Sequence, residues 1–338
     1  MRLLEPTEAS AMNENVILLS AGRRVDLLHG FQAAIKRFAP GASVFAADMR
    51  PSRSAACQLA NQSFTLPSVS DRNYVAQLAD VCQRQRIGLV VPTIDTELLV
   101  LSQNREAFRE FGTELLVSDT SLVSLCRDKR RTGDLFERIG ISTPEVYDVS
   151  EIRFPCFTKF YDGSSSIGTA KLESELDLTA AMKGESRRIF MELVPPEYNE
   201  FTTDIYFDRT CSLKALIPRQ RLEVRGGEVS KGITRRNWVY DYLLSRVVAI
   251  TGAVGCLTLQ LFAGPSEGDV YAIEINPRFG GGFPLTLAAG ADFPGWLIRE
   301  YLLGESLPFF DTWESNLLML RYDAKVLVHN YGDDKSVS

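Results

Sequence analysis

Residues 15–118 alternate between continuous apolar runs and amphipathic segments, and this alternation restricts the fold more than any other feature of the sequence. Runs such as NVILLS (15–20) and GLVVPT (88–93) are apolar enough to be strands that are buried on both faces. Between such runs, apolar residues recur at helical spacing, most clearly over residues 23–38. We therefore predict an α/β, Rossmann-like domain over residues 15–118, with a parallel sheet covered by helices on both faces.

The turns that follow these strands carry the candidate ligand contacts of the domain. The turn SAGRR (20–24) has one glycine where a dinucleotide pyrophosphate loop needs three, so we predict that the domain does not bind NAD. Asp95 and Glu97 follow the strand at 88–93, at the edge where open α/β sheets place ligands. Two interpretations stay open for them: residues that cap the following helix, or substrate contacts.

Length, charge and histidine content exclude several classes of function. The 338 residues suit two to three packed lobes. The formal net charge of -6 argues against nucleic acid or an anionic membrane as the main partner, and no apolar run approaches the ~20 residues that span a bilayer. Only two histidines are present, so the chemistry must rest on carboxylates, lysines and arginines. The six separated cysteines indicate reduced thiols in a cytoplasmic protein.

From residue 119 onward the pattern changes to paired helices followed by antiparallel strands. Two helices are expected in 119–144, strands at 154–160, 187–194, 200–208 and 211–224, and a hairpin of 256–263 with 269–276. We predict α+β lobes at 119–190 and 191–330 within one domain, 119–330. The segments 1–14 and 331–338 are expected to be disordered.

The stretch TKFYDGSSSIG (158–168) combines a lysine near a strand end with a loop of small residues. Glycines let several backbone N–H groups approach an anion, serine hydroxyls add donors, and Lys159 supplies a point charge. These are the means of binding phosphate, although the sequence has no GxxxxGK[ST] P-loop. A plain hairpin remains the alternative for this segment.

Polar residues also interrupt three later strands. Glu192 ends the strand in FMELV (190–194) and Glu200 starts the next; both are either functional or solvated carboxylates of a surface hairpin. Gln260 lies within the apolar strand CLTLQLFA (256–263), where a polar side chain needs a partner.

The run YAIEINPRFGGG (271–282) sets Glu274, Asn276 and Arg278 at every second position. The two-residue period of a strand predicts that these three side chains share one face, while Ile273 and Ile275 take the opposite, core face. Oxygen ligands at this spacing suit a hard cation such as Mg²⁺, and the arginine could then bind phosphate beside it. A structural Glu–Arg pair is the alternative.

The order of these parts resembles the ATP-grasp superfamily. It runs from Lys129 in CRDK through Lys159, MELV, Glu200 and Gln260 to EINPRFGGG. The chain is most similar to single-copy proteins that resemble the large subunit of carbamoyl phosphate synthase, over roughly residues 15–325. The resemblance implies a pre-ATP-grasp domain at 15–118 and a two-lobed ATP-grasp domain at 119–330.

The resemblance also implies roles for individual residues. The implied ATP-binding residues are Lys129, Lys159, Gly163, Ser164, Ser165, Ser166, Gly168, Glu192, Leu193, Val194 and Glu200. The segment 162–168 would form a lid over the triphosphate. The implied metal ligands are Gln260, Glu274 and Asn276. The implied catalytic residues are Arg278, Lys159 and Asn276, and the implied substrate contacts are Arg221, Gly280, Gly281 and Gly282.

Some positions depart from the family pattern. The segment PPEYN (195–199) precedes Glu200 where many relatives have a glycine, so Glu197 could contact the ribose instead. Gln260 replaces an acidic ligand, so a second Mg²⁺ could bind weakly or through water. Arg219, Arg221 and Lys231 form a basic cluster that faces either the triphosphate, an acidic substrate or only solvent.

The implied activity is that of an ADP-forming carboxylate–amine ligase. ATP with Mg²⁺, or Mn²⁺ in its place, would convert a small-molecule carboxylic acid to an acyl phosphate, which an amine then attacks. The alternatives are carbamoyl-phosphate-synthase-like chemistry and a non-catalytic ATP-binding regulatory module. The habit of the family implies a homodimer, and neither a membrane nor a nucleic acid is expected as partner.

Overall fold

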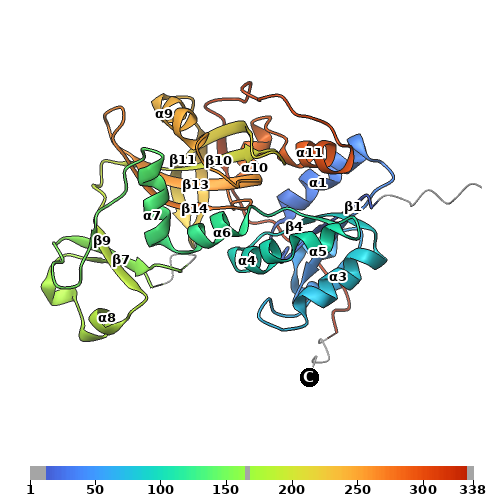
Figure 1. The fold of residues 1–338 in the computed structure, drawn as a ribbon, viewed down its shortest axis with the longest axis horizontal. Helices are drawn as coiled ribbons and strands as arrows, with labels where there is room; N and C mark the ends of the chain where they lie inside the picture. Colours follow the sequence, from blue (N-terminus) through green and yellow to red (C-terminus); the bar gives the residue numbers. More distant parts are fainter. Residues whose placement is uncertain (1–12, 164–167, 333–338) are drawn as a thin grey trace, which may run out of the picture.

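A computed structural model describes residues 13–163 and 168–332 of the chain, and three sheets organise these residues (Figure 1). The predictions for 1–12, 333–338 and the serines at 164–166 lie outside the described residues. Two residues within the termini expected to be disordered make specific contacts. The Asn13 side chain donates a 2.8 Å hydrogen bond to the carbonyl of Phe111, and Arg53 donates one of 3.1 Å to the hydroxyl of Tyr331.

The N-terminal domain is a five-stranded parallel sheet with strand order β3-β2-β1-β4-β5, as the alternating pattern predicted. Its strands are β1 (Asn15–Leu18), β2 (Val44–Asp48), β3 (Ser63–Thr65), β4 (Ile87–Val91) and β5 (Glu114–Leu115). Its helices are α1 (Val25–Phe38), α2 (Ala55–Leu59), α3 (Tyr74–Arg84), α4 (Asp95–Gln103) and α5 (Arg105–Arg109), with a 3₁₀ turn at Pro51–Arg53. From the sequence ELLVLSQNREAFREF we expect one helix over 97–111, but the structure divides this segment between α4 and α5.

Alternate residues of the central strand enter two different cores. Val16 and Leu18 belong to a large core that α1 and α2 share with the rest of the molecule. Ile17 and Leu19 belong to a second core formed with α3, α4 and α5. A strand that is apolar throughout is stable only when both faces are covered in this way.

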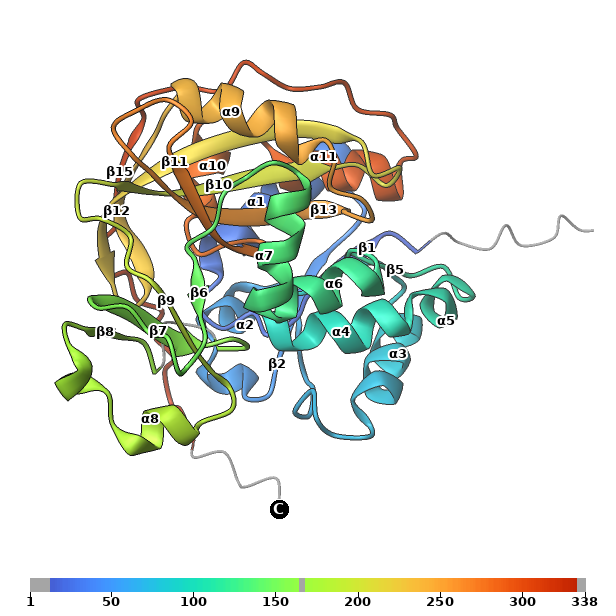
Figure 2. The same ribbon diagram turned by 60° about the vertical axis from the view of Figure 1, so that its left-hand side comes forward.

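Two consecutive helices, α6 (Thr120–Arg127) and α7 (Lys129–Arg138), lead into a small lobe. This lobe is a four-stranded antiparallel sheet with strand order β6-β9-β7-β8. Its elements are β6 (Val146–Tyr147), β7 (Cys156–Phe160), β8 (Ala170–Leu172), a 3₁₀ turn at Glu175–Asp177, α8 (Ala180–Gly184) and β9 (Arg188–Glu192). The predicted lobe boundary at residue 190 therefore falls inside β9. Figure 2 shows the small lobe below the larger sheet, close to the end of β12.

The larger lobe is a six-stranded antiparallel sheet with strand order β14-β13-β10-β11-β12-β15. Its strands are β10 (Asn199–Phe207), β11 (Leu213–Arg225), β12 (Glu228–Thr234), β13 (Gly255–Ala263), β14 (Val270–Asn276) and β15 (Leu318–Leu320). The helices are α9 (Trp238–Val247), α10 (Phe283–Ala288) and α11 (Phe293–Leu297), which continues as a π-helical turn at Ile298–Leu302. The predicted hairpin of β13 with β14 is confirmed.

Helix α1 of the N-terminal domain packs against α10 and α11, so the first and last parts of the chain lie side by side (Figures 1 and 2). This packing places the turn between β1 and α1 next to the segment that follows β14. Among residues 13–163 and 168–332, no helix combines the length and apolar character needed to cross a bilayer.

Candidate active site

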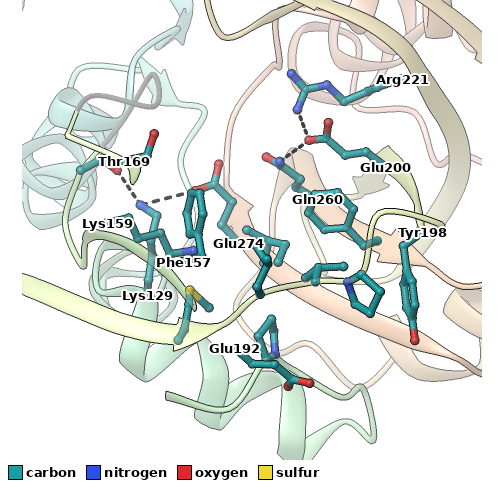
Figure 3. A pocket seen from close by; sticks show the side chains of 18 of the residues that line it. Lys129, Phe157, Lys159, Thr169, Glu192, Tyr198, Glu200, Arg221, Gln260 and Glu274 are labelled. Atoms are coloured by element: carbon teal, nitrogen blue, oxygen red, sulfur yellow. Dashed lines mark hydrogen bonds and ion pairs between the residues drawn. The ribbon is translucent and has the colours of Figure 1, made fainter. Parts of the chain in front are cut away.

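A cavity of about 480 Å³ lies between the small lobe and the six-stranded sheet (Figure 3). It is lined by residues of β7, β9, β10, β13 and β14, together with the segment that joins β9 to β10. Apolar walls and a few convergent polar groups characterise small-molecule sites. The lining residues include Lys129, Phe157, Lys159, Gly163, Met191, Glu192, Leu193, Val194, Tyr198, Glu200, Arg221, Gln260, Phe262, Ile273 and Glu274.

Two lysines and one carboxylate converge at one end of this first cavity. Lys129 starts α7, and its Nζ lies 3.4 Å from Oε2 of Glu274 and donates a 2.5 Å hydrogen bond to the carbonyl of Gly163. Lys159 on β7 is buried, and burial lowers its pKa to about 8, an effect that Glu274 opposes and Lys129 reinforces. Two ammonium groups against one carboxylate leave a cationic excess, which suits an anionic ligand.

The pKa of Glu274 lies below its ordinary value despite burial. Burial alone would raise that pKa, but the charge of Lys129, a hydrogen bond from Asn276 and the charge of Lys159 together lower it. The bond from Asn276 Nδ2 to Glu274 Oε1 measures 2.9 Å. Glu274 is therefore a carboxylate at neutral pH and can act as a metal ligand.

A β-bulge in β14 changes which residues face the first cavity. Gln260 pairs with Glu274, but the next residue of β13, Leu261, pairs with Ala272, so Ile273 is an extra residue in the strand. The prediction that Ile273 takes the core face with Ile275 is wrong, because Ile273 lines the cavity beside Glu274. Only Ile275 is in the core. A bulge places two consecutive residues opposite one and so reverses the alternation.

Glu200 lies at the other end of the first cavity between two partners. Its carboxylate accepts a hydrogen bond from Arg221 and one of 2.5 Å from Gln260 Nε2 (Figure 3). Burial raises the pKa of Glu200, while Arg221 and Gln260 oppose that shift. Glu197 is exposed and does not line the cavity, so Glu200 is the better placed of the two predicted ribose contacts.

The side chain of Glu192 points away from the lysines in Figure 3. Its Oε1 accepts a 3.0 Å bond from the hydroxyl of Tyr271, and its Oε2 accepts one of 3.3 Å from the backbone of Glu145. Within the described part of the chain, the backbone groups of Leu193 and Val194 make no hydrogen bond. At this point of the cavity, the backbone groups of Leu193 and Val194 are available to a ligand, whereas the Glu192 carboxylate is occupied.

A second cavity, of about 620 Å³, lies between the N-terminal domain and the carboxyl end of β14. It shares Lys129, Gly163 and Glu274 with the first cavity, so these three residues lie at the junction of the two. Its other lining residues include Arg24, Val69, Thr93, Asp95, Leu99, Val123, Arg127, Asn276 and Arg278.

Arg278 is bound by Asp95 across this second cavity. Arg278 Nε and Nη2 donate to Asp95 Oδ1 and Oδ2 at 3.0 and 2.6 Å, and Nη2 also lies 3.4 Å from Oδ1 of Asn276. The interpretation of Asp95 as a helix cap is wrong, because the residue before α4 is Ile94 and no side chain caps that helix. The rival interpretation of Arg278 as the partner of Glu274 also fails, since its carboxylate partner is Asp95.

The basic cluster predicted on β11 and β12 is dispersed. Arg219 is buried and paired with Asp204 at 2.7 Å, and Lys231 is an exposed partner of Glu223. Only Arg221 enters a cavity, and it enters the first one beside Glu200, so its predicted contact with the acid substrate is not supported by its position.

The three predicted substrate-contacting glycines have different surroundings. Gly280 and Gly281 line a third cavity, of about 110 Å³, next to the turn between β1 and α1. Gly282 lies against the buried guanidinium of Arg219, where an added Cβ would be 1.9 Å from Nη1. Gly282 therefore serves packing, and only Gly280 and Gly281 remain predicted substrate contacts.

The predicted metal-binding residues suit magnesium only if a bound substrate supplies additional oxygen atoms to coordinate the ion. In the part of the chain that the structure describes, no three His, Cys, Asp or Glu side chains gather as a metal site. Glu274 contributes a carboxylate, and the amides of Gln260 and Asn276 contribute neutral oxygens. Magnesium usually binds one or two carboxylates plus water and substrate phosphates, so this donor set suits it when a triphosphate is present.

The residues missed by sequence reasoning are mainly those that complete the site from elsewhere in the chain. Tyr198, Phe157 and Phe262 form cavity walls, but their apolar spacing is indistinguishable from that of core residues. Arg24 lies in the SAGRR turn and lines the second and third cavities. The sequence signal for it is its position just after a buried strand, at the edge where open α/β sheets place ligands.

Comparison with known proteins supports the resemblance in both halves of the chain. Residues 16–116 match the family model described as PylC-like, N-terminal domain. The chain is 24% identical over 282 residues to the carbamoyl phosphate synthase large chain of Rubrobacter xylanophilus, covering 70% of this chain and 26% of that protein. It is 20% identical over 279 residues to the N-terminal section of the Aquifex aeolicus large chain, covering 70% and 50%. The chain thus spans about a quarter of the full-length large chain.

Solved structures confirm the fold. One similar structure is the biotin carboxylase domain of Hydrogenobacter thermophilus 2-oxoglutarate carboxylase, a dimer in complex with MgADP, ADP and bicarbonate. It superimposes with a TM-score of 0.71 at 18% identity, over 91% of this chain and 73% of that one. An ADP complex of N5-carboxyaminoimidazole ribonucleotide synthetase gives 0.70 at 18% identity, over 91% and 81%. The chain has the ATP-grasp fold, and the predicted fold class and resemblance are confirmed.

Proposed function

We propose that this protein is an ADP-forming ligase that uses ATP to activate a small-molecule carboxylic acid and joins it to an amine. The observation that carries the proposal is the junction of two cavities at Lys129, Gly163 and Glu274. A nucleotide in the first cavity would end in a triphosphate at this junction, and an acid in the second cavity would reach the same point.

The first cavity suits ATP along its whole length. The backbone of 192–194 would bind the adenine edge, Glu200 the ribose hydroxyls, and Lys129 with Lys159 the phosphates. Magnesium held by Glu274, Asn276 and Gln260 would neutralise phosphate charge and orient the γ-phosphate. Gly163 and Gly168 belong to the segment 162–168, the predicted lid over the triphosphate.

The second cavity would hold the acid against the γ-phosphate. The carboxylate attacks the γ-phosphorus, so the bond from the γ-phosphorus to the bridging oxygen breaks and ADP leaves, giving an acyl phosphate. An amine then attacks the acyl carbon, loses a proton and displaces phosphate. Arg278 would stabilise the charge on the transferring group, because Asp95 fixes the orientation of its guanidinium. The enzyme needs no covalent nucleophile for this reaction.

ADP release in the presence of ATP and Mg²⁺ tests the proposal. Purified protein is incubated with pools of carboxylic acids and amines and, separately, with bicarbonate and ammonia. Stimulation by an acid with an amine is expected, whereas stimulation only by bicarbonate with ammonia would favour carbamoyl-phosphate-like chemistry.

Variants of Glu274 separate catalysis from simple nucleotide binding. Glu274→Ala should abolish turnover and leave a smaller rise in melting temperature with MgATP. Glu223→Ala, which removes a glutamate from an exposed pair outside both cavities, should do neither. Full stabilisation by MgATP without any stimulated ADP release in the unmodified protein would mean a non-catalytic nucleotide-binding module.

A further inference from the structure

Arg24 is a cation of the N-terminal domain that contributes to two cavities at once. It precedes α1 and lines both the second cavity, which contains Arg278, and the third cavity, which contains Gly280 and Gly281. Arg24 itself does not line the first cavity. Arg24 therefore connects the proposed reaction site with the small polar cavity lined by Gly280 and Gly281, the two remaining predicted substrate contacts.

The charges around the third cavity leave Arg24 without a carboxylate partner. Glu228 accepts a 3.1 Å hydrogen bond from Arg321 and lies 3.6 Å from Arg23. Among the described residues, Arg24 forms no ion pair within 4.0 Å, and the one hydrogen bond of its side chain is a 3.5 Å contact from Nη2 to the carbonyl of Thr93. A guanidinium has five N–H donors, so most of those of Arg24 remain available.

Arg278 has fewer free donors for an additional anion than Arg24 has. Its Nε and Nη2 donate to Asp95, and its Nη1 donates to the carbonyl of Phe279 at 3.1 Å. Arg24 is near enough to Arg278 to be affected by it: burial first, and then the charge of Arg278, lower the pKa of Arg24, while Glu228 and Asp95 act in the opposite direction. A half-buried cation beside another cation is stabilised when an anion binds it.

The absence of a side chain at Gly281 keeps the space beside Arg24 open. A Cβ at this position would lie 3.5 Å from Nη1 of Arg24 and 3.3 Å from Oε1 of Glu228. The backbone of Gly281 is not in the left-handed region, so a side chain would disturb this close approach and not the backbone conformation.

We propose that Arg24 binds a second anionic group of the acid substrate and that the third cavity receives this group. The proposal rests on the proposed ligase function and specifies its substrate class: small acids that carry, besides the carboxylate to be activated, another carboxylate or a phosphate. The reacting carboxylate would lie in the second cavity near Arg278, and the second anion would lie on the far side of Arg24. The role of Arg24 is then to determine specificity.

Binding of simple probes to the MgADP-loaded protein tests the subsite without any turnover. The probes are succinate, with two carboxylates; 3-phosphonopropionate, with a carboxylate and a phosphonate; and butyrate, with one carboxylate. Saturating MgADP occupies the first cavity, so that the lysines there do not bind the probes. Affinities are measured by calorimetry or by the rise in melting temperature.

Succinate, 3-phosphonopropionate or both should bind at least about tenfold more tightly than butyrate, which is the effect of one charge-assisted hydrogen bond. The preferred probe distinguishes a carboxylate from a phosphate. Arg24→Gln should remove the preference, Arg24→Lys should retain part of it, and Arg37→Gln, at the exposed end of α1, should leave it unchanged. Equal binding of all three probes, or an undiminished preference in Arg24→Gln, would overturn the proposal.

Kinetics with an active acid provide an independent measurement. Arg24→Gln should raise KM for a dianionic acid about 10- to 100-fold, with kcat at saturating acid and KM for ATP unchanged. A selective loss of kcat, or a rise in KM for ATP, would contradict the assigned role. If no acid stimulates ADP release, the ligase proposal fails while probe binding still decides the role of Arg24.

Discussion

The carboxylate of Asp95 and the guanidinium of Arg278 form a two-pronged ion pair, 183 residues apart in the chain, with N–O distances of 3.0 and 2.6 Å. Asp95 begins α4 of the N-terminal domain, and Arg278 follows β14 of the larger lobe. This pair fixes the arginine predicted to be catalytic to the domain predicted to hold the substrate. It therefore links the geometry of the reaction site to the position of the N-terminal domain.

Replacing Asp95 by Asn should reduce kcat without weakening nucleotide binding. An amide retains at most one acceptor for Arg278, and a misplaced catalytic group can cost up to about 100-fold in rate. The measurements are kcat for acid-stimulated ADP release and Kd for MgATP. Asp80→Asn, which removes one exposed ion pair of the same domain with Arg84, is the matched control. A fall in MgATP affinity as large as the fall in kcat would show that Asp95 does not act through Arg278.

Lys159→Ala should weaken MgATP binding about 10- to 100-fold, the loss expected for one charge-assisted hydrogen bond to phosphate. The ammonium of Lys159 is buried beside Glu274, so no water-exposed lysine can readily replace it. Lys171→Ala removes an exposed lysine of the same small lobe and should leave the affinity unchanged. Calorimetric titration measures the MgATP affinity of both variants. Unchanged MgATP affinity in Lys159→Ala would favour the alternative interpretation, that the 158–168 segment is a plain hairpin without a phosphate-binding role.

The fold and part of the lining of the first cavity were predictable from sequence because local periodicity determines them. The two-residue period of β14 brought Glu274 and Asn276 to one face, and the apolar strands of 15–118 predicted the covered parallel sheet. The bulge at Ile273 was not predictable, since an inserted residue has no signature in a strand that is apolar on both sides of it.

Long-range pairings were the part that sequence reasoning could not supply. Arg219 and Arg221 are two residues apart, yet one is buried against Asp204 and the other lies in the first cavity beside Glu200. Their neighbours in space, not their neighbours in sequence, separate these roles. The pairing of Asp95 with Arg278 likewise depends on how two domains pack, which periodicity within either domain does not report.

Glu97 should make stability depend on pH. It is buried, its Oε1 accepts hydrogen bonds from Ser20 at 2.5 Å and Tyr74 at 3.1 Å, and its Oε2 has no partner among the described residues. Burial raises the pKa of Glu97 to about 7 from 4.5. A carboxyl whose pKa is raised on folding favours the folded state fully below pH ~4.5, and this contribution is lost as pH rises through about 7.

Urea unfolding at pH 5 and pH 8 measures this effect. The free energy of unfolding of the wild type, relative to that of Glu97→Gln, should be lower at pH 8 than at pH 5, by an amount of up to about 3 kcal/mol. Glu110→Gln, at an exposed position of the same domain, serves as the control. A difference between wild type and Glu97→Gln that does not change with pH would mean that Glu97 titrates alike in the folded and unfolded chains.

Gly282→Ala should destabilise the protein far more than Gly281→Ala, although the two glycines are adjacent. A Cβ at Gly282 would lie 1.9 Å from Nη1 of Arg219, whereas one at Gly281 would lie 3.2 Å from its nearest neighbour, the carboxylate carbon of Glu228. Arg219 cannot easily move away, because it is buried and its partner Asp204 is fully buried too.

Overpacking typically costs about 1–3 kcal/mol, and separating a buried ion pair costs about 3–5 kcal/mol. We therefore expect Gly282→Ala to lower the free energy of unfolding by about 3 kcal/mol, and Gly281→Ala to lower it by less than about 1 kcal/mol, since only the exposed end of Glu228 must shift. Unfolding in urea of the two variants provides the comparison. Equal stability of the two variants would show that the Arg219 side chain can shift while keeping its ion pair with Asp204. A glycine at position 282 would then be needed for substrate contact and not for packing.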